Sequence, residues 1–264
     1  MWEQLVEAPM WIGSDALDPV RPEYKVPCQL YNLDGVAYES VLLGLFTIWR
    51  GQFPDRQKPN EVCLGYSRDG WTWSRPDRRA FCPVSDKQGE WNANNVQSVG
   101  GGYLVVGDQL HFYVSGRAGE AGSNKQGVCT TGLALLRRDG FASMDAGEGG
   151  GTLTTRPLKF SGSRLFVNLD APKGELRAEA IDEKGDVLAT LGPVVGDGTR
   201  LSVKGDLAGL AGRTLRLRFR LTRGRLYAFW VSPDESGASR GYVGAGGPGY
   251  PGPLDTIGSA AAPR

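Results

Sequence analysis

Short apolar or alternating runs, each closed by turn residues, fill most of the first 140 positions of the chain. They are SVLLGLFTIW (40–49), EVCLGYS (61–67), GGYLVVG (101–107), QLHFYVSG (109–116) and TGLALLRR (131–138). Runs of this length and pattern, with almost no helical periodicity between them, predict strands. Gly107-Asp108 separates two of the runs and suits a two-residue hairpin, because glycine supplies the positive φ of a type II′ turn.

The pattern of apolar and polar residues changes after GEGGG (147–151). TLRLRFRL (214–221) alternates strictly between apolar and polar positions, as a strand with one solvated face does. Further runs, with turns expected at Lys173-Gly174 and Lys184-Gly185, predict an antiparallel β-sandwich over 150–235. Residues 236–264 are rich in Gly, Pro and Ala, and we expect a tail that lies over the surface and frays at its end.

Two segments of the N-terminal region read as repeats of one another. LLGLFTIWRG (42–51) matches QLHFYVSGRA (109–118), NLD (32–34) matches NVQ (95–97), and the Asp-Gly pairs at 69–70 and 139–140 also correspond. A group of strands repeated every 60 to 70 residues predicts propeller blades, here at about 25–85 and 90–147 of a domain over 1–147. Two ordinary meanders in one sandwich are the alternative. Asp69 and Asp139 are expected to be structural, accepting backbone N–H bonds at the blade corner.

Composition narrows the class of protein. Glycine accounts for 39 of 264 residues, which agrees with many tight turns. Thirty basic and 29 acidic residues nearly cancel, so we expect neither a nucleic-acid nor a membrane partner. The opening MWEQLVEAPMW has neither the basic nor the apolar region of a signal peptide. Four cysteines without a pairing pattern favour the cytoplasm over a secreted state.

Several chemistries are excluded by residue type. His111 is the single histidine and lies in an apolar run. A catalytic histidine base or a metal site with an imidazole ligand would have to use this one residue. Cys28, Cys63, Cys82 and Cys129 are scattered, with no C-x-x-C spacing. The glycine-rich stretches do not stand between a strand and a helix, as a phosphate-binding loop requires. We therefore expect neither a cofactor nor a metal.

The turn motif SRDGWTW (67–73), followed by a predicted sandwich, resembles the five-bladed propeller glycoside hydrolases of families 32 and 43. More closely, YNLDGVAYESVLLGLFTIWRG, GYSRDGWTWSRPDR, WNANNVQSVGGG, TGLALLRRDGFASM, TLTTRPLKF and LFVNLDAPKGELRAEAID look like a group of bacterial proteins labelled family-32-like. The resemblance implies an all-β fold, a partial propeller of two to three blades followed by a β-sandwich. The W-M-N-D-P-N-G motif of family 32 has no counterpart. Two blades fit before the sandwich, with MWEQLVEAPMWIG as a remnant of a third, so we expect the C-terminal portion of such a protein.

In a blade, side chains at the start of the innermost strand and at the end of the next one reach the central mouth. Asp34, Asn95 and Gln97 begin inner strands in this arrangement, and Arg50 and Arg117 end the strands beside them. Convergent polar groups are what a sugar site requires. The resemblance also puts Asp34 near the aspartate of the R-D-P motif of the related hydrolases, with Leu33 and Gly35 as departures. Trp49, beside Arg50, is the better candidate for stacking on a sugar, whereas Trp71 and Trp73 are expected to pack on their own turn.

Glycosidic cleavage needs a second carboxyl group, about 5–5.5 Å from the first for retention and about 6.5–9.5 Å for inversion. Asp15 and Glu90 lie on loops that could reach the mouth, and Asp15 ranks first, with Glu90 as a substrate contact. Asp18 precedes a proline and reads as a turn residue, and Glu39 should face the opposite mouth.

Three functions stay open at this stage. The first is a glycoside hydrolase with Asp34 and Asp15 as its carboxylates. The second is a non-catalytic carbohydrate-binding or scaffold protein. The third is an assembly protein whose open blade edges pair with another copy or with a second polypeptide.

Overall fold

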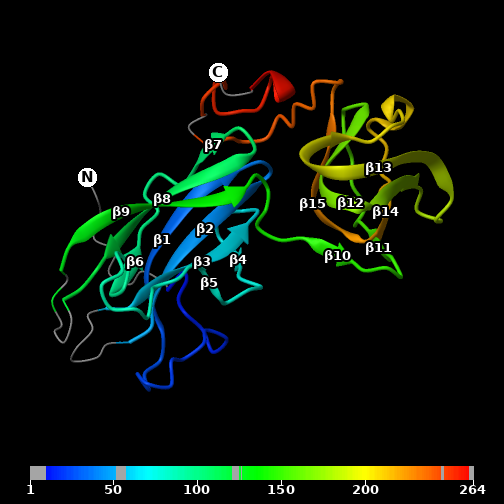
Figure 1. The fold of residues 1–264 in the computed structure, drawn as a ribbon. Coiled ribbons are helices and arrows are strands. Elements are labelled where there is room, and N and C mark those ends of the chain that lie inside the picture. Colours follow the sequence, from blue (N-terminus) through cyan, green and yellow to red (C-terminus); the bar gives the residue numbers. More distant parts are fainter. Residues whose placement is uncertain (1–9, 52–57, 121–124, 126, 245–246, 262–264) are drawn as a thin grey trace. The chain divides into compact units, whose positions relative to one another are not determined.

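The computed structural model describes residues 10–51, 58–120, 125, 127–244 and 247–261. Its elements are almost all strands, so the all-β prediction is confirmed (Figure 1). The chain divides into two compact units, one with residues up to Tyr103 and Phe112–Ala134, the other with Leu104–His111 and the residues from Leu135 onward. The boundaries expected at 147, 150 and 235 stay predictions. Most of the proposed third-blade remnant, residues 1–9, lies outside the described part.

The first unit begins with a five-stranded antiparallel sheet in chain order, β1-β2-β3-β4, with β5 also paired to β3. The bounds are β1 Gln29–Tyr38, β2 Val41–Trp49, β3 Asn60–Ser67, β4 Trp73–Ser74 and β5 Ala80–Cys82. The predicted runs at 40–49 and 61–67 are confirmed as β2 and β3. Such a meander is what one propeller blade requires.

One face of this first sheet packs against the segment that precedes it. Phe46, Ile48 and Cys63 form a buried cluster with Cys28, and Ile12 and Leu33 lie against that cluster. Because successive side chains of a strand point to opposite faces, Leu33 and its neighbour Asp34 face opposite ways. Residues 12–28 therefore cover the face that Asp34 does not use.

The Asp-Gly turn between β3 and β4 is fixed by Asp69. Its Oδ1 accepts hydrogen bonds from the backbone N–H groups of Trp71 (2.9 Å) and Thr72 (2.7 Å) and from the Ser67 hydroxyl (2.9 Å). These bonds to Thr72, Trp71 and Ser67 stabilise the carboxylate and lower the pKa of Asp69 to about 2. Gly70 has φ of +74°, which glycine adopts without strain. The structural role predicted for Asp69 is confirmed, whereas that of Asp139 stays a prediction.

The second sheet contains β6 Asn95–Gln97, β7 Leu104–Val106, β8 Gln109–Arg117 and β9 Cys129–Arg137. Strand β8 pairs with β6 through 95–97, with β7 through 104–106, and with β9. Val106 and Gln109 are direct partners across Gly107-Asp108, and Gly107 has φ of +58°, so the two-residue hairpin is confirmed. Trp91 packs on this sheet, since a Cβ placed on Gly116 or Gly132 would lie 2.2 or 2.3 Å from its ring.

The second unit holds a six-stranded sheet in which β12 is the central strand. Its bounds are β10 Met144–Ala146, β11 Gly151–Thr154, β12 Arg164–Ile181, β13 Val187–Ser202, β14 Arg216–Thr222 and β15 Gly224–Ser232. The first part of β12 (164–170) pairs with β15 and its last part (175–181) with β14, while β13 pairs along both. All pairings in this sheet are antiparallel, and β12 pairs with different strands along its two halves, which is consistent with the expected sandwich.

The turn predicted at Lys173-Gly174 is wrong, because β12 continues through it. Gly174 instead lies so close to the β14–β15 connection that a Cβ would meet the carbonyl oxygen of Thr222 at 1.7 Å. The turn predicted at Lys184-Gly185 is confirmed. There the N–H of Gly185 donates to the carbonyl of Asp182 at 3.1 Å, and Gly185 has φ of +93°.

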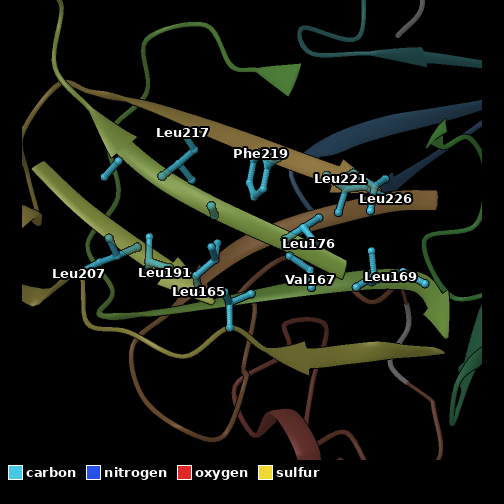
Figure 2. Close-up of a cluster of buried hydrophobic side chains, with 14 of the residues drawn as sticks. Leu165, Val167, Leu169, Leu176, Leu191, Leu207, Leu217, Phe219, Leu221 and Leu226 are labelled. Atoms are coloured by element: carbon cyan, nitrogen blue, oxygen red, sulfur yellow. The ribbon is translucent and has the colours of Figure 1, made fainter. Parts of the chain in front are cut away.

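The core of the second unit is built from alternate residues of these strands (Figure 2). Leu165, Val167 and Leu169 come from the first part of β12, and Leu217, Phe219 and Leu221 come from β14. Each fully buried leucine or phenylalanine stabilises the fold by about 1.5–3 kcal/mol.

The C-terminal region is anchored by a buried carboxylate. Asp255 is fully buried and forms ion pairs with Arg138 (3.1 Å) and Arg200 (3.5 Å).

The structure also contains two short 3₁₀ helices, Ala208–Leu210 and Gly258–Ala261. Neither these nor any other helix in the described residues has the length and apolar content to cross a membrane.

Candidate functional site

Asp34 lies in the middle of β1, opposite Leu45 of β2. Its Oδ2 accepts a hydrogen bond of 2.8 Å from the backbone N–H of Val99, just after β6. Next to it, Thr47 Oγ1 accepts a 3.3 Å bond from the N–H of Ser98. Side-chain acceptors of the first sheet therefore hold the segment that follows β6.

A second pair of contacts extends this line of polar groups. Asn60 Nδ2, at the start of β3, donates to Gln97 Oε1 at 3.1 Å. Asn95 Nδ2 donates to the carbonyl oxygen of Lys58 at 2.8 Å. We call the polar side chains along this line the inter-sheet seam; they are Asn32, Asp34, Thr47, Asn60, Asn95 and Gln97. Three of the residues that the sequence singles out, Asp34, Asn95 and Gln97, each make one of these contacts, and their role in one common site stays a prediction.

Three amide oxygens of the seam are buried and have no hydrogen-bond partner among the residues that the structure describes. They are the Oδ1 atoms of Asn32, Asn60 and Asn95. Buried polar atoms in folded proteins nearly always have a partner, and a carbonyl oxygen can only accept. The seam therefore calls for donors, such as water, a hydroxyl-bearing ligand or a cation. Clusters of three or more His, Cys, Asp and Glu side chains that could hold a metal ion are not found in the described residues.

Trp49 and Arg117 border the seam. Trp49 ends β2 directly opposite Asn60, and Arg117 ends β8 directly opposite Asn95. Arg117 Nη1 donates to the Ser115 hydroxyl at 2.7 Å and to the Gly116 carbonyl at 3.0 Å. Both side chains are half-buried, as are Asp34 and Gln97, whereas Thr47, Asn60 and Asn95 are buried. The seam thus contains both half-buried and fully buried polar side chains.

Asp15 lies elsewhere. Its carboxylate pairs with Arg78 (2.8 Å), and Arg78 also contacts Asp18 (3.5 Å). Asp18 in turn binds Arg75, whose guanidinium lies 4.9 Å from the ring of Phe46, on the face of the first sheet opposite to Asp34. Desolvation is the largest single influence on Asp15 and raises its pKa. The hydrogen bonds from Arg78 and from the Leu17 N–H, together with the positive charges of Arg78 and Arg75, outweigh desolvation and lower the pKa overall. The structure does not bring Asp15 and Asp34 into one site, and their pairing stays a prediction.

Arg50 is enclosed on that same opposite face. Its Nε donates to Glu61 at 2.9 Å, and its Nη atoms contact the sulfurs of Cys28 (3.5 Å) and Cys63 (3.3 Å). Only 2% of the residue is exposed. Unlike Arg117, its repeat counterpart, Arg50 does not border the seam, and its substrate-binding role stays a prediction.

Glu90 is occupied within its own loop. Its Oε2 accepts a short hydrogen bond from the Ser85 hydroxyl, and its Oε1 lies 3.7 Å from Lys87 Nζ. Nothing in these contacts links Glu90 to the seam, and its role as a substrate contact stays a prediction.

Sequence reasoning missed Asn32, Thr47 and Asn60. Each one is a polar residue in or next to an apolar run, and Thr47 is fully buried inside LGLFTIW. A buried polar position inside a strand is a signal that could have found them, since such positions need hydrogen-bond partners.

Comparisons with known proteins add little. No family model and no curated protein matches the chain. Among solved structures, one match is a glycoside hydrolase family 43 arabinoxylan arabinofuranohydrolase from Bacillus subtilis in complex with cellotetraose. It is 11% identical, with a TM-score of 0.26, and the match covers 76% of this chain and 53% of that one. This chain spans about half the length of that protein. A likeness this weak assigns neither activity nor ligand.

Proposed function

We propose that this protein binds a carbohydrate at the inter-sheet seam, with Asp34 as the central polar group. The observation that carries the proposal is the row of polar side chains along the seam, where three amide oxygens lack a donor among the described residues and Asp34 and Arg117 are half-buried. Sugar hydroxyls are donors as well as acceptors, so they would bind the half-buried side chains of the seam, Asp34 and Gln97. Trp49, at the edge of the seam, adds an aromatic surface of the kind that binding sites use.

Hydrolysis of a glycosidic bond is the finer proposal. It requires a second carboxyl group in reach of the bond that Asp34 faces. Within the described residues, Asp34 is the one carboxylate that forms part of the seam. This favours a binding protein over a catalyst, and an assay for sugar release from the bound glycoside would separate the two.

The test is calorimetric titration with a panel of neutral oligosaccharides. We expect the wild type to bind at least one of them and Asp34→Asn to weaken that affinity tenfold or more. The amide keeps the acceptor for Val99 but loses the charge, and a hydrogen bond to a charged group contributes about 1.5–3 kcal/mol.

Asp77→Asn is the matched control, because Asp77 is exposed and pairs with Arg79. It should bind like the wild type. A wild type that binds no sugar, or equal affinities for Asp34→Asn and the wild type, would contradict the proposal.

A further inference from the structure

Strand β14 carries a row of arginines on its outward face. Arg216, Arg218 and Arg220 alternate with Leu217 and Phe219, which belong to the core of the second unit. Figure 2 labels Leu217, Phe219 and Leu221 in that core. Because side chains alternate across a strand, the three arginines point away from the core.

The neighbouring strands extend this polar face. Arg220 stands opposite Arg177 of β12 and Thr152 of β11, and Arg218 stands opposite Glu179 and Thr154. The side chains of Arg220 and Arg177 are 54% and 50% exposed. We call the outward side chains of these three strands the arginine face; they are Thr152, Thr154, Glu175, Arg177, Glu179, Arg216, Arg218 and Arg220.

The arginine face has an excess of positive charge that its own carboxylates do not balance. It holds four arginines and two glutamates, a net charge of +2, whereas the whole chain has a net charge of +1. Glu179 is shared between Arg218 (2.6 Å) and Arg220 (3.5 Å), and Glu175 pairs with Arg177 (2.7 Å). Arg216 has no ion-pair partner in the part of the chain that the structure describes. Each guanidinium has five N–H donors, so most donors remain available.

We propose that the arginine face binds an acidic polysaccharide, with carboxylate or sulfate groups on its sugars. Planar guanidinium groups form paired hydrogen bonds with such anions, and Thr152 and Thr154 offer hydroxyls beside them. Arginines two apart on a strand are about 6.8 Å apart, which suits a polymer whose charges are spaced by whole sugar rings.

The same face is poorly suited to nucleic acid. None of its side chains is aromatic, so none can stack on a base. Duplex DNA carries a charge about every 1.7 Å, and Glu175 and Glu179 would lie against that dense row of phosphates. This inference shares no residue with the inter-sheet seam and stands whether or not the seam binds a sugar.

The test compares binding of polygalacturonate, heparin, neutral dextran and duplex DNA at low and physiological salt. We expect binding to at least one of the two acidic polysaccharides, weaker at higher salt, with no binding to dextran and weaker binding to DNA. Arg216→Gln should reduce the affinity about threefold, and Arg216→Gln with Arg220→Gln tenfold or more. Arg216 forms no ion pair within the described residues, so we expect its single variant to fold and to remain informative if the double variant does not fold.

The matched control is Lys184→Gln with Arg240→Gln, which removes two exposed charges from the same unit that do not stand on β11, β12 or β14. It should change the affinity less than twofold. The proposal is overturned if the wild type binds neither acidic polysaccharide, if DNA binds more tightly than both, if the control loses as much as the arginine variants, or if Arg216→Gln binds like the wild type.

Discussion

At the scale of single residues, the first unit contains a buried ion pair between Asp18 and Arg75. The Asp18 side chain is fully buried and that of Arg75 is 3% exposed, and both guanidinium Nη atoms bind the carboxylate. Asp18→Ala would leave a buried cation unpaired, so we expect the free energy of unfolding to fall by about 3–5 kcal/mol. Urea denaturation of the variant and the wild type measures this loss.

The control for that variant is Asp77→Ala. Asp77 and Arg79 also form an ion pair, at 2.6 Å, but both side chains are mostly exposed. Exposed pairs contribute about 0–1 kcal/mol, so this variant should unfold at nearly the same urea concentration as the wild type. Similar losses in the two variants would mean that burial of the Asp18–Arg75 pair is not what stabilises the segment.

At the scale of elements, β12 depends on a glycine in its middle, Gly174. A Cβ on Gly174 would lie 1.7 Å from the carbonyl oxygen of Thr222 and 2.5 Å from that of Arg223, both backbone atoms that cannot rotate away. We therefore expect Gly174→Ala to lower the free energy of unfolding by about 1–3 kcal/mol or more. Gly209→Ala, which meets nothing within 4 Å, should be nearly neutral. The measurement is the midpoint of thermal unfolding of both variants. Equal midpoints would show that the backbone at Thr222 and Arg223 can move away from residue 174.

The sequence predicts the elements that its local pattern controls. Strict alternation identifies β14, and Gly107-Asp108 identifies the hairpin between β7 and β8, because each depends on residues a few positions apart. It does not predict that β12 runs on through Pro172-Lys173-Gly174, since these residues favour a turn and only the packing against Thr222 overrides them.

The same limit applies to the candidate site. The sequence singles out Asp34, Asn95 and Gln97 because it places them at the start of inner strands. Asn95 does begin β6, but Asp34 lies in the middle of β1 and Gln97 ends β6. Asn32 and Thr47 are missed because their polarity matters only once the segment after β6 packs against the first sheet. Asp15 is placed by its pairing with Arg78, 63 residues further along the chain, a contact that no spacing in the sequence reveals.

At the scale of the whole molecule, the buried thiols make the free energy of unfolding depend on pH in the alkaline range. Burial raises the pKa of Cys82 to about 11, with Cys63 nearby adding to the effect, and burial also raises the pKa of Cys63. An unfolded thiol ionises near pH 9, so between pH 9 and 11 the unfolded chain releases a proton that the folded protein retains. The stability that Cys82 contributes is therefore fully present below pH 9 and is lost as the pH rises toward 11, by up to about 1.4 kcal/mol per pH unit.

Cys82→Ala isolates this contribution, because every other titrating group is common to both proteins. The variant will be less stable at pH 8, where it has only lost packing, but its urea midpoint should fall less steeply than that of the wild type between pH 9 and 10.5. The two curves should therefore converge with rising pH. Parallel curves would mean that the Cys82 thiol ionises equally well in both states, and that its surroundings admit water in the folded protein.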